Sequence, residues 1–146
     1  EKHIQFMGNK PPRFYVETGW PCFAAMPYLS DRLKGQIQFV HMIRHPIYTA
    51  MSMLTHSYYN SENPGKIGEL ALLTPFDEGV NFPEFQNFWD NMSPFEKCLY
   101  FWAEIHCFIL QHQRASNAPF VTIQFESLFS PNDECLRMMQ QKQHID

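Results

Sequence analysis

The sequence predicts a three-layer α/β domain built on a parallel sheet. Short aromatic or β-branched segments alternate along the chain with amphipathic helical patterns, and one such segment, residues 36–43, ends in a nearly continuous apolar run. Strands separated by helices lie parallel and are joined by right-handed crossovers, and a strand inside a parallel sheet is buried on both faces. The 146 residues suffice for a single domain, residues 1–146, with a sizeable core.

The first strand and helix are predicted within the first 35 residues. Residues 13–18, Arg-Phe-Tyr-Val-Glu-Thr, are aromatic and β-branched and are followed by Gly19, which predicts a strand. Apolar residues at helical spacing follow, and they predict a helix that closes near Gly35. Pro27 must then lie in the first turn of this helix or kink it.

The second unit joins the buried strand to a helix that starts at a proline. Residues 36–43 predict the strand, and Pro46 has the fixed φ that suits a first helical residue. Apolar residues on one face continue this helix to about residue 59. Residues 60–92 contain repeated Gly and Pro and predict a loop-rich excursion. Two local helix starts are predicted within it: Thr74-Pro75-Phe76-Asp77, and Asn81 with Glu84.

The last third of the chain supplies the clearest helix. Ser93-Pro94-Phe95-Glu96 is a capping box with proline at the first helical position, and apolar residues at helical spacing continue the helix to about Arg114. Residues 119–125 predict another strand, and residues 130–141 predict a final helix.

Charge and hydropathy exclude several classes of function. Eleven Lys plus Arg against fifteen Asp plus Glu give a net charge of −4, and the basic residues form no cluster, so we expect no nucleic-acid partner. No apolar run approaches the length of a transmembrane helix, and the first residues are not organised as a signal peptide. We therefore expect a cytoplasmic protein, whose oligomeric state stays open.

The four cysteines predict free thiols. Cys98 and Cys107 fall within one predicted helix, where nine residues separate them by roughly 13 Å, too far for a disulfide. We expect these two, Cys22 and Cys135 to be reduced, as in a reducing compartment. No close Cys/His pairing typical of zinc is present, so no metal is predicted.

The carboxyl ends of parallel strands, where ligands bind in such sheets, select three candidate places. These are Glu17-Thr18-Gly19, Arg44-His45-Pro46 and Glu126-Ser127. Arg44 joins a strand to a helix start, where its guanidinium can grip a phosphate and the helix adds partial positive charge. Ser52, eight residues later, can reach the same anion. The alternative is that Arg44 pairs with a carboxylate and Ser52 is an ordinary helix serine.

Residues 39–52 resemble the 3′-phosphate-binding segment of the sulfotransferase family. The shared features are an apolar strand, then Arg-His-Pro, then a Ser eight residues after the Arg. Residues 15–18 resemble the preceding strand of bacterial members. Residues 121–131 resemble the family's late strand, which continues into Tyr-Glu-Asp-Leu and a proline-initiated helix; Phe125 and Ser127 depart from that pattern. The three matches occur in the family's order.

The resemblance implies a partial P-loop NTPase-like sulfotransferase fold. It implies transfer of a sulfuryl group from 3′-phosphoadenosine 5′-phosphosulfate, without a metal, to a hydroxyl or amine of a small-molecule, carbohydrate or peptide acceptor. Arg44 and Ser52 would hold the 3′-phosphate of the donor. Such an in-line transfer relies on positioning and on neutralising charge. Glu17 is the candidate general base, since a partly buried carboxylate can have a raised pKa; the alternative is a structural ion-pair or capping carboxylate.

One part of the family pattern has no counterpart in this chain. The family's 5′-phosphosulfate loop precedes these segments, but residues 7–12 contain only a Gly and a Lys, without a Gly-rich turn that leads into a helix. Either the chain is a fragment or it is a remnant; we expect a fragment, with weak or no transferase activity in isolation. Two rival functions stay open: another P-loop-type nucleotide enzyme, such as a small kinase, and a non-catalytic interaction domain that keeps only the fold.

Further residues have expected local roles. We expect His41 and His45 to be local hydrogen-bonding partners and Glu126 to anchor its strand to a loop. Aromatic residues in the excursion form either local core or the lid of an acceptor pocket. These residues are Phe76, Phe82, Phe85, Phe88 and Trp89.

Overall fold

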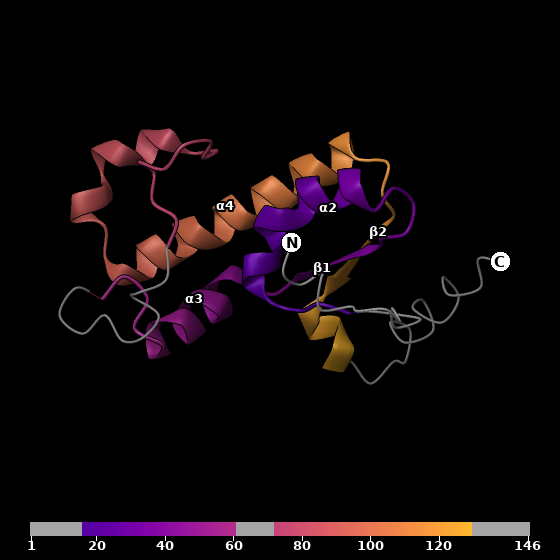
Figure 1. The fold of residues 1–146 in the computed structure, drawn as a ribbon. Coiled ribbons are helices and arrows are strands. Elements are labelled where there is room, and N and C mark those ends of the chain that lie inside the picture. Colours follow the sequence, from indigo (N-terminus) through magenta and orange to yellow (C-terminus); the bar gives the residue numbers. More distant parts are fainter. Residues whose placement is uncertain (1–15, 61–71, 130–146) are drawn as a thin grey trace.

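The computed structural model of the chain describes residues 16–60 and 72–129. Predictions for residues 1–15, 61–71 and 130–146, the final helix among them, lie outside the described residues. The described part is a mixed α/β structure with a two-stranded parallel sheet (Figure 1). Its elements, with 3-10 helices marked η, are η1 (Trp20–Ala25), α2 (Met26–Arg32), β1 (Phe39–Ile43), α3 (Pro46–Thr55), η3 (Pro83–Asn87), η4 (Trp89–Asn91), α4 (Pro94–Ala115), β2 (Phe120–Gln124) and η5 (Phe125–Phe129).

The parallel pairing of two strands is confirmed. β1 and β2 align with Val40 opposite Val121, and α3 and α4 lie between them in the chain. The strand predicted over residues 13–18 is wrong for its described part, because residues 16–18 are irregular and Val16 is 81% exposed. An aromatic and β-branched composition is not enough, since a strand also needs a neighbour to pair with and a covered face.

The prediction that β1 is buried on both faces is wrong. His41 is 3% exposed, whereas Val40 and Met42 on either side of it are 59% and 46% exposed. Successive side chains of a strand point to opposite faces. α4 lies against the His41 face, where His106 contacts His41. The apolar run therefore has one covered face and one exposed face.

Two helices have a proline in their first turn, as predicted. Pro27 lies in the first turn of α2, and Pro46 is the first residue of α3. α3 ends at Thr55, earlier than the predicted residue 59. Ser57 and Tyr59 have φ angles of 60° and 55°, in the left-handed region that an α-helix cannot continue through.

The core lies between α3 and α4, which run side by side (Figure 1). Ala50 of α3 packs here with Cys98 and Phe101 of α4, and none of the three has exposed surface. The Tyr58 ring meets the Phe101 ring edge-on, with centroids 5.9 Å apart. Ile105 continues the buried stripe of α4 at helical spacing. α4 is thus the central element that positions both α3 and β1.

The capping box at the start of α4 is confirmed. Ser93 Oγ accepts a hydrogen bond from the Glu96 backbone N–H at 3.3 Å, and the Ser93 backbone N–H donates to Glu96 Oε2 at 2.7 Å. The two bonds satisfy backbone donors that the helix start would otherwise leave unpaired. Hydrogen bonds from Ser93 also hold the pKa of the Glu96 carboxyl below its usual value.

Removal of the cap should destabilise the protein. Ser93→Ala is expected to lower the free energy of unfolding by about 1 kcal/mol, because the Glu96 amide loses its side-chain acceptor. Urea unfolding followed by circular dichroism measures this. Ser93→Thr, which keeps the hydroxyl, serves as the control, and its free energy of unfolding should fall by less than that of Ser93→Ala. Equal losses for the two variants would contradict the role of the hydroxyl.

Candidate functional site

The carboxyl ends of β1 and β2 are joined by a hydrogen bond. His45 follows β1, and its backbone N–H donates to Glu126 Oε1, which follows β2, at 2.8 Å. This hydrogen bond is the main cause that lowers the pKa of the Glu126 carboxyl. The predicted anchoring role of Glu126 is confirmed, and the loop that carries Arg44 is fixed at the sheet edge.

Arg44 is exposed at this edge, and both its backbone and its side chain are placed by neighbours. Its carbonyl accepts a hydrogen bond from Trp102 Nε1 of α4 at 3.1 Å. Its guanidinium lies over the Phe125 ring of η5, 5.1 Å from the centroid. No carboxylate of the described residues forms an ion pair with it, although its charge contributes to the lowered pKa of Glu126. Among the described residues, the guanidinium therefore has an aromatic neighbour and no carboxylate partner.

The start of α3 adds donors next to Arg44. His45, the residue before the helix, makes no side-chain capping bond, and Pro46 has no N–H of its own. First-turn amides without a cap, together with the helix dipole, favour an anion. Ser52 lies in the next turn, half-buried, and no hydrogen bond joins its hydroxyl to Arg44. Arg44 and Ser52 therefore share one strand-to-helix unit, with no hydrogen bond between them.

Glu17 does not follow a strand, as its predicted place requires. It is exposed in the irregular segment before η1, where no strand forms. Burial raises the pKa of the Cys22 thiol, and the negative charge of Glu17 adds to this effect. The assignment of Glu17 as a base therefore stays a prediction that rests on the family resemblance.

A pair of histidines that the sequence did not predict joins β1 to α4. His41 Nε2 of β1 and His106 Nδ1 of α4 are 2.7 Å apart, so one nitrogen donates to the other. His106 also stacks near Trp102, with ring centroids 4.3 Å apart. Burial lowers the pKa of His41. Burial also lowers the pKa of His106, and the nearby His41 adds to this effect, so that the pKa of His106 is about 4. The prediction of a local hydrogen-bonding role is confirmed for His41.

A buried carboxylate, also missed, holds the excursion onto α4. Glu104 is 2% exposed and accepts three hydrogen bonds: from Asn81 N at 2.9 Å, from Asn81 Nδ2 at 2.8 Å and from Phe82 N at 2.8 Å. Gln111 Nε2 donates to Asn81 Oδ1 at 2.6 Å. The predicted helix start at Asn81 with Glu84 is therefore wrong. The residue before η3 is Phe82, and η3 has no side-chain cap.

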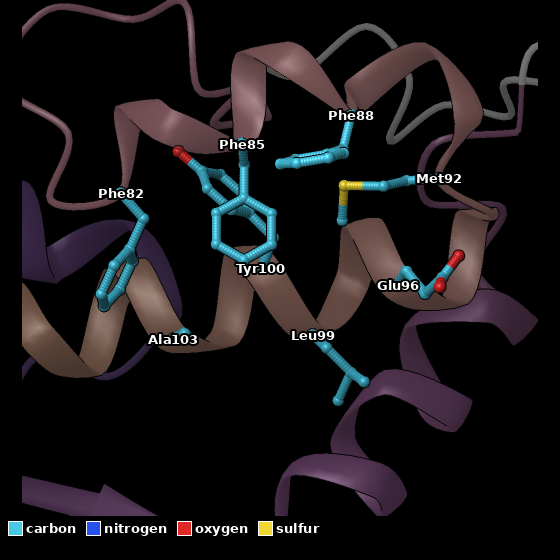
Figure 2. A pocket seen from close by; sticks show the side chains of 8 residues that line it. All are labelled: Phe82, Phe85, Phe88, Met92, Glu96, Leu99, Tyr100 and Ala103. Atoms are coloured by element: carbon cyan, nitrogen blue, oxygen red, sulfur yellow. The ribbon is translucent and has the colours of Figure 1, made fainter.

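The aromatic residues of the excursion divide into core and surface. Trp89 is buried and packs against Tyr100, with ring centroids 5.2 Å apart. Phe76 and Phe88 are 62% and 61% exposed. Phe82, Phe85 and Phe88 line a pocket of about 490 Å³ between the excursion and α4 (Figure 2). Figure 2 places α3 on the other side of α4 from these rings.

Other features of the described residues bear on the remaining predictions. Cys22, Cys98 and Cys107 are free thiols, and Cys135 lies outside the described residues. The described part contains no group of three or more His, Cys, Asp or Glu side chains that could hold a metal ion. No helix within it has the length and apolar character to cross a membrane.

Comparisons with protein families, with curated proteins and with solved structures find no match for this chain.

Proposed function

We propose that the chain belongs to a sulfotransferase-like domain in which Arg44 and Ser52 hold the 3′-phosphate of 3′-phosphoadenosine 5′-phosphosulfate. The observation that carries the proposal is the unit β1–Arg44–Pro46–α3, placed at the carboxyl edge of a parallel sheet. Ligands of such sheets bind at that edge. Arg44 has no carboxylate partner among the described residues, and the α3 start lacks a side-chain cap. These features fit a phosphate dianion.

The three-layer, P-loop NTPase-like fold is part of this proposal. Parallel strands with helices between them in the chain are the repeating unit of such folds. Parallel sheets are ordinarily covered on both faces, whereas Val40 and Met42 leave one face of β1 exposed. A third layer on that face would complete the arrangement.

Each residue has a stated role in the proposed reaction. The donor supplies the sulfuryl group, and the protein binds and orients it. Arg44 grips the 3′-phosphate through paired N–H donors and the α3 start adds partial positive charge. Ser52 supplies a hydroxyl to the same phosphate, and Glu17 removes the proton of an acceptor hydroxyl or amine. The acceptor class is not specified by these residues.

Binding of 3′-phosphoadenosine 5′-phosphate, measured by NMR titration, tests the proposal. Arg44→Ala should weaken binding at least about tenfold, because a bidentate charged contact is lost. Adenosine 5′-phosphate lacks the 3′-phosphate. It should bind the unsubstituted protein about as weakly as 3′-phosphoadenosine 5′-phosphate binds Arg44→Ala.

Arg114→Ala is the matched control for this titration. Arg114 is exposed in the last turn of α4, which leads to the amino end of β2 and not to its carboxyl end. Its loss should leave the affinity unchanged. Equal binding by wild type and Arg44→Ala would overturn the assignment of the phosphate site. Tighter binding of ATP that requires Mg²⁺ would favour the rival kinase function.

A further inference from the structure

The pocket between the excursion and α4 is lined almost entirely by aromatic and apolar side chains. Figure 2 shows the Phe82, Phe85 and Phe88 rings along the excursion side, with the Tyr100 ring beside Phe85 and with Met92 next to Phe88. Its volume of about 490 Å³ is in the range of small-molecule sites. The lining residues are Phe82, Phe85, Phe88, Met92, Glu96, Leu99, Tyr100 and Ala103.

The pocket is open to solvent and yet apolar. Phe88 is 61% exposed and Phe85 is 36% exposed, although the Phe85 ring packs against the Tyr100 ring. Phe76, which precedes these residues in the same excursion, is equally exposed but does not line the pocket. The exposed rings of the pocket thus present π-faces and edges to any molecule that enters.

The chain around the pocket is mostly acidic. Residues 72–97 contain one Lys and five carboxylates: Asp77, Glu78, Glu84, Asp90 and Glu96. Glu96 lines the pocket itself. Negative charge near Tyr100 from Glu104, Asp77 and Glu84 adds to the effect of burial in raising the pKa of this phenol. The pocket therefore attracts cations and repels anions.

The same aromatic cluster already holds an ammonium group. Lys97 Nζ lies over the Trp89 ring, 4.9 Å from its centroid, and Trp89 packs against Tyr100 of the pocket wall. An ammonium over an aromatic face is stabilised by the ring quadrupole. Trp89 does not itself line the pocket, so the Lys97 ammonium lies beside the pocket wall and not inside the pocket.

The Tyr100 hydroxyl is buried beside the Glu104 carboxylate, which adds to the effect of burial in raising the pKa of this phenol. The ring of Tyr100, and not its hydroxyl, is therefore the part that faces a molecule in the pocket.

We propose that this pocket binds an organic cation, with an alkylammonium head group placed among Phe82, Phe85, Phe88 and Tyr100. Aromatic rings supply the cation–π attraction, and the surrounding carboxylates supply charge complementarity. The proposal is independent of the phosphate site at Arg44, because the pocket lies on the side of α4 away from α3.

Two probes of one shape and different charge test the proposal. Choline carries a quaternary ammonium, and 3,3-dimethylbutan-1-ol is its neutral isostere. Titration of the 146-residue chain, followed by NMR, should show choline binding about tenfold more tightly than the isostere, with the preference reduced at high salt. Equal binding of both probes would make the pocket merely apolar and overturn the proposal. So would the failure of choline to bind at millimolar concentration.

Matched variants locate the binding. Phe85→Leu keeps an apolar side chain but removes a ring, and it should weaken choline binding several-fold. Phe76→Leu, at an exposed ring outside the pocket, should change nothing. Glu84→Gln, at an exposed site that need not disturb folding, should weaken choline binding about twofold without affecting the isostere. Equal effects of Phe85→Leu and Phe76→Leu, or no effect of Glu84→Gln, would contradict the proposal.

Discussion

Replacement of Glu104 with leucine is expected to lower the free energy of unfolding by about 3–4 kcal/mol. The carboxylate is 2% exposed and accepts hydrogen bonds from Asn81 N, Asn81 Nδ2 and Phe82 N. Leucine accepts none of them, and each buried donor left without a partner costs about 1–3 kcal/mol. Partial access of water to the freed donors keeps the loss below the sum of the three.

The loss should depend on the number of acceptors that remain. Glu104→Gln keeps one acceptor oxygen, so its free energy of unfolding should fall by less than that of the leucine variant. Glu84→Gln, at an exposed carboxylate of the excursion, is the control and should stay within about 0.5 kcal/mol of wild type. Urea unfolding measures all three. A leucine variant as stable as wild type would mean that the cost of burying the carboxylate offsets its three hydrogen bonds.

Acidification from pH 7 to pH 4 is expected to destabilise the fold by about 2–3 kcal/mol through the His41–His106 pair. Burial, followed by the nearby His41, lowers the pKa of His106 to about 4, and burial also lowers the pKa of His41. In the unfolded chain each imidazole titrates near 6.5. The unfolded state therefore binds more protons below that pH, so the stabilising contribution is complete above about pH 6.5 and is lost as the pH falls toward 4.

Variants separate this effect from the titration of carboxylates. His106→Phe removes one titrating ring, so the curve of stability against pH should flatten between 6.5 and 4 relative to wild type. His56→Gln, at an exposed histidine, should leave the curve unchanged. Unfolding midpoints in urea at several pH values provide the measurement. A curve for His106→Phe that parallels wild type would assign the acid sensitivity to other groups, such as Glu126, whose carboxyl pKa is also lowered.

Signals that act within a few residues predicted most of the confirmed structure. The cap at Ser93 and Glu96 and the helix start at Pro46 were read from sequence, because proline geometry and capping involve only adjacent residues. The two strands that flank α3 and α4 were also recognised, and their alternation with helices predicted parallel pairing.

Features that depend on distant residues were not predicted. The apolar run of β1 indicated burial on both faces, but burial depends on which elements cover the sheet, and α4 covers only the His41 face. Glu104 sits within the buried stripe of α4, next to Phe101 and Ile105, which was the one available sign of an unusual carboxylate. Its partners, more than twenty residues away, left no local pattern.

The same distinction applies to the candidate site. Arg44 was found from its position after a strand, and the structure places it at the sheet edge with Glu126. Its support by Trp102 could not be read from spacing, because the indole comes from a helix 58 residues later. Glu17 was selected by the same strand-end rule, but residues 16–18 form no strand.

The two-point attachment of Asn81 has a consequence for how this protein can change over evolution. Glu104 and Gln111 lie two helical turns apart on α4, and Asn81 binds both, so the entry to η3 is fixed by the helix and not by the composition of the excursion. Substitutions at Phe85 or Phe88 can then alter the chemistry of the pocket wall while its position on α4 is retained. The residues that fix the position of the excursion are thus distinct from the exposed rings of the pocket wall.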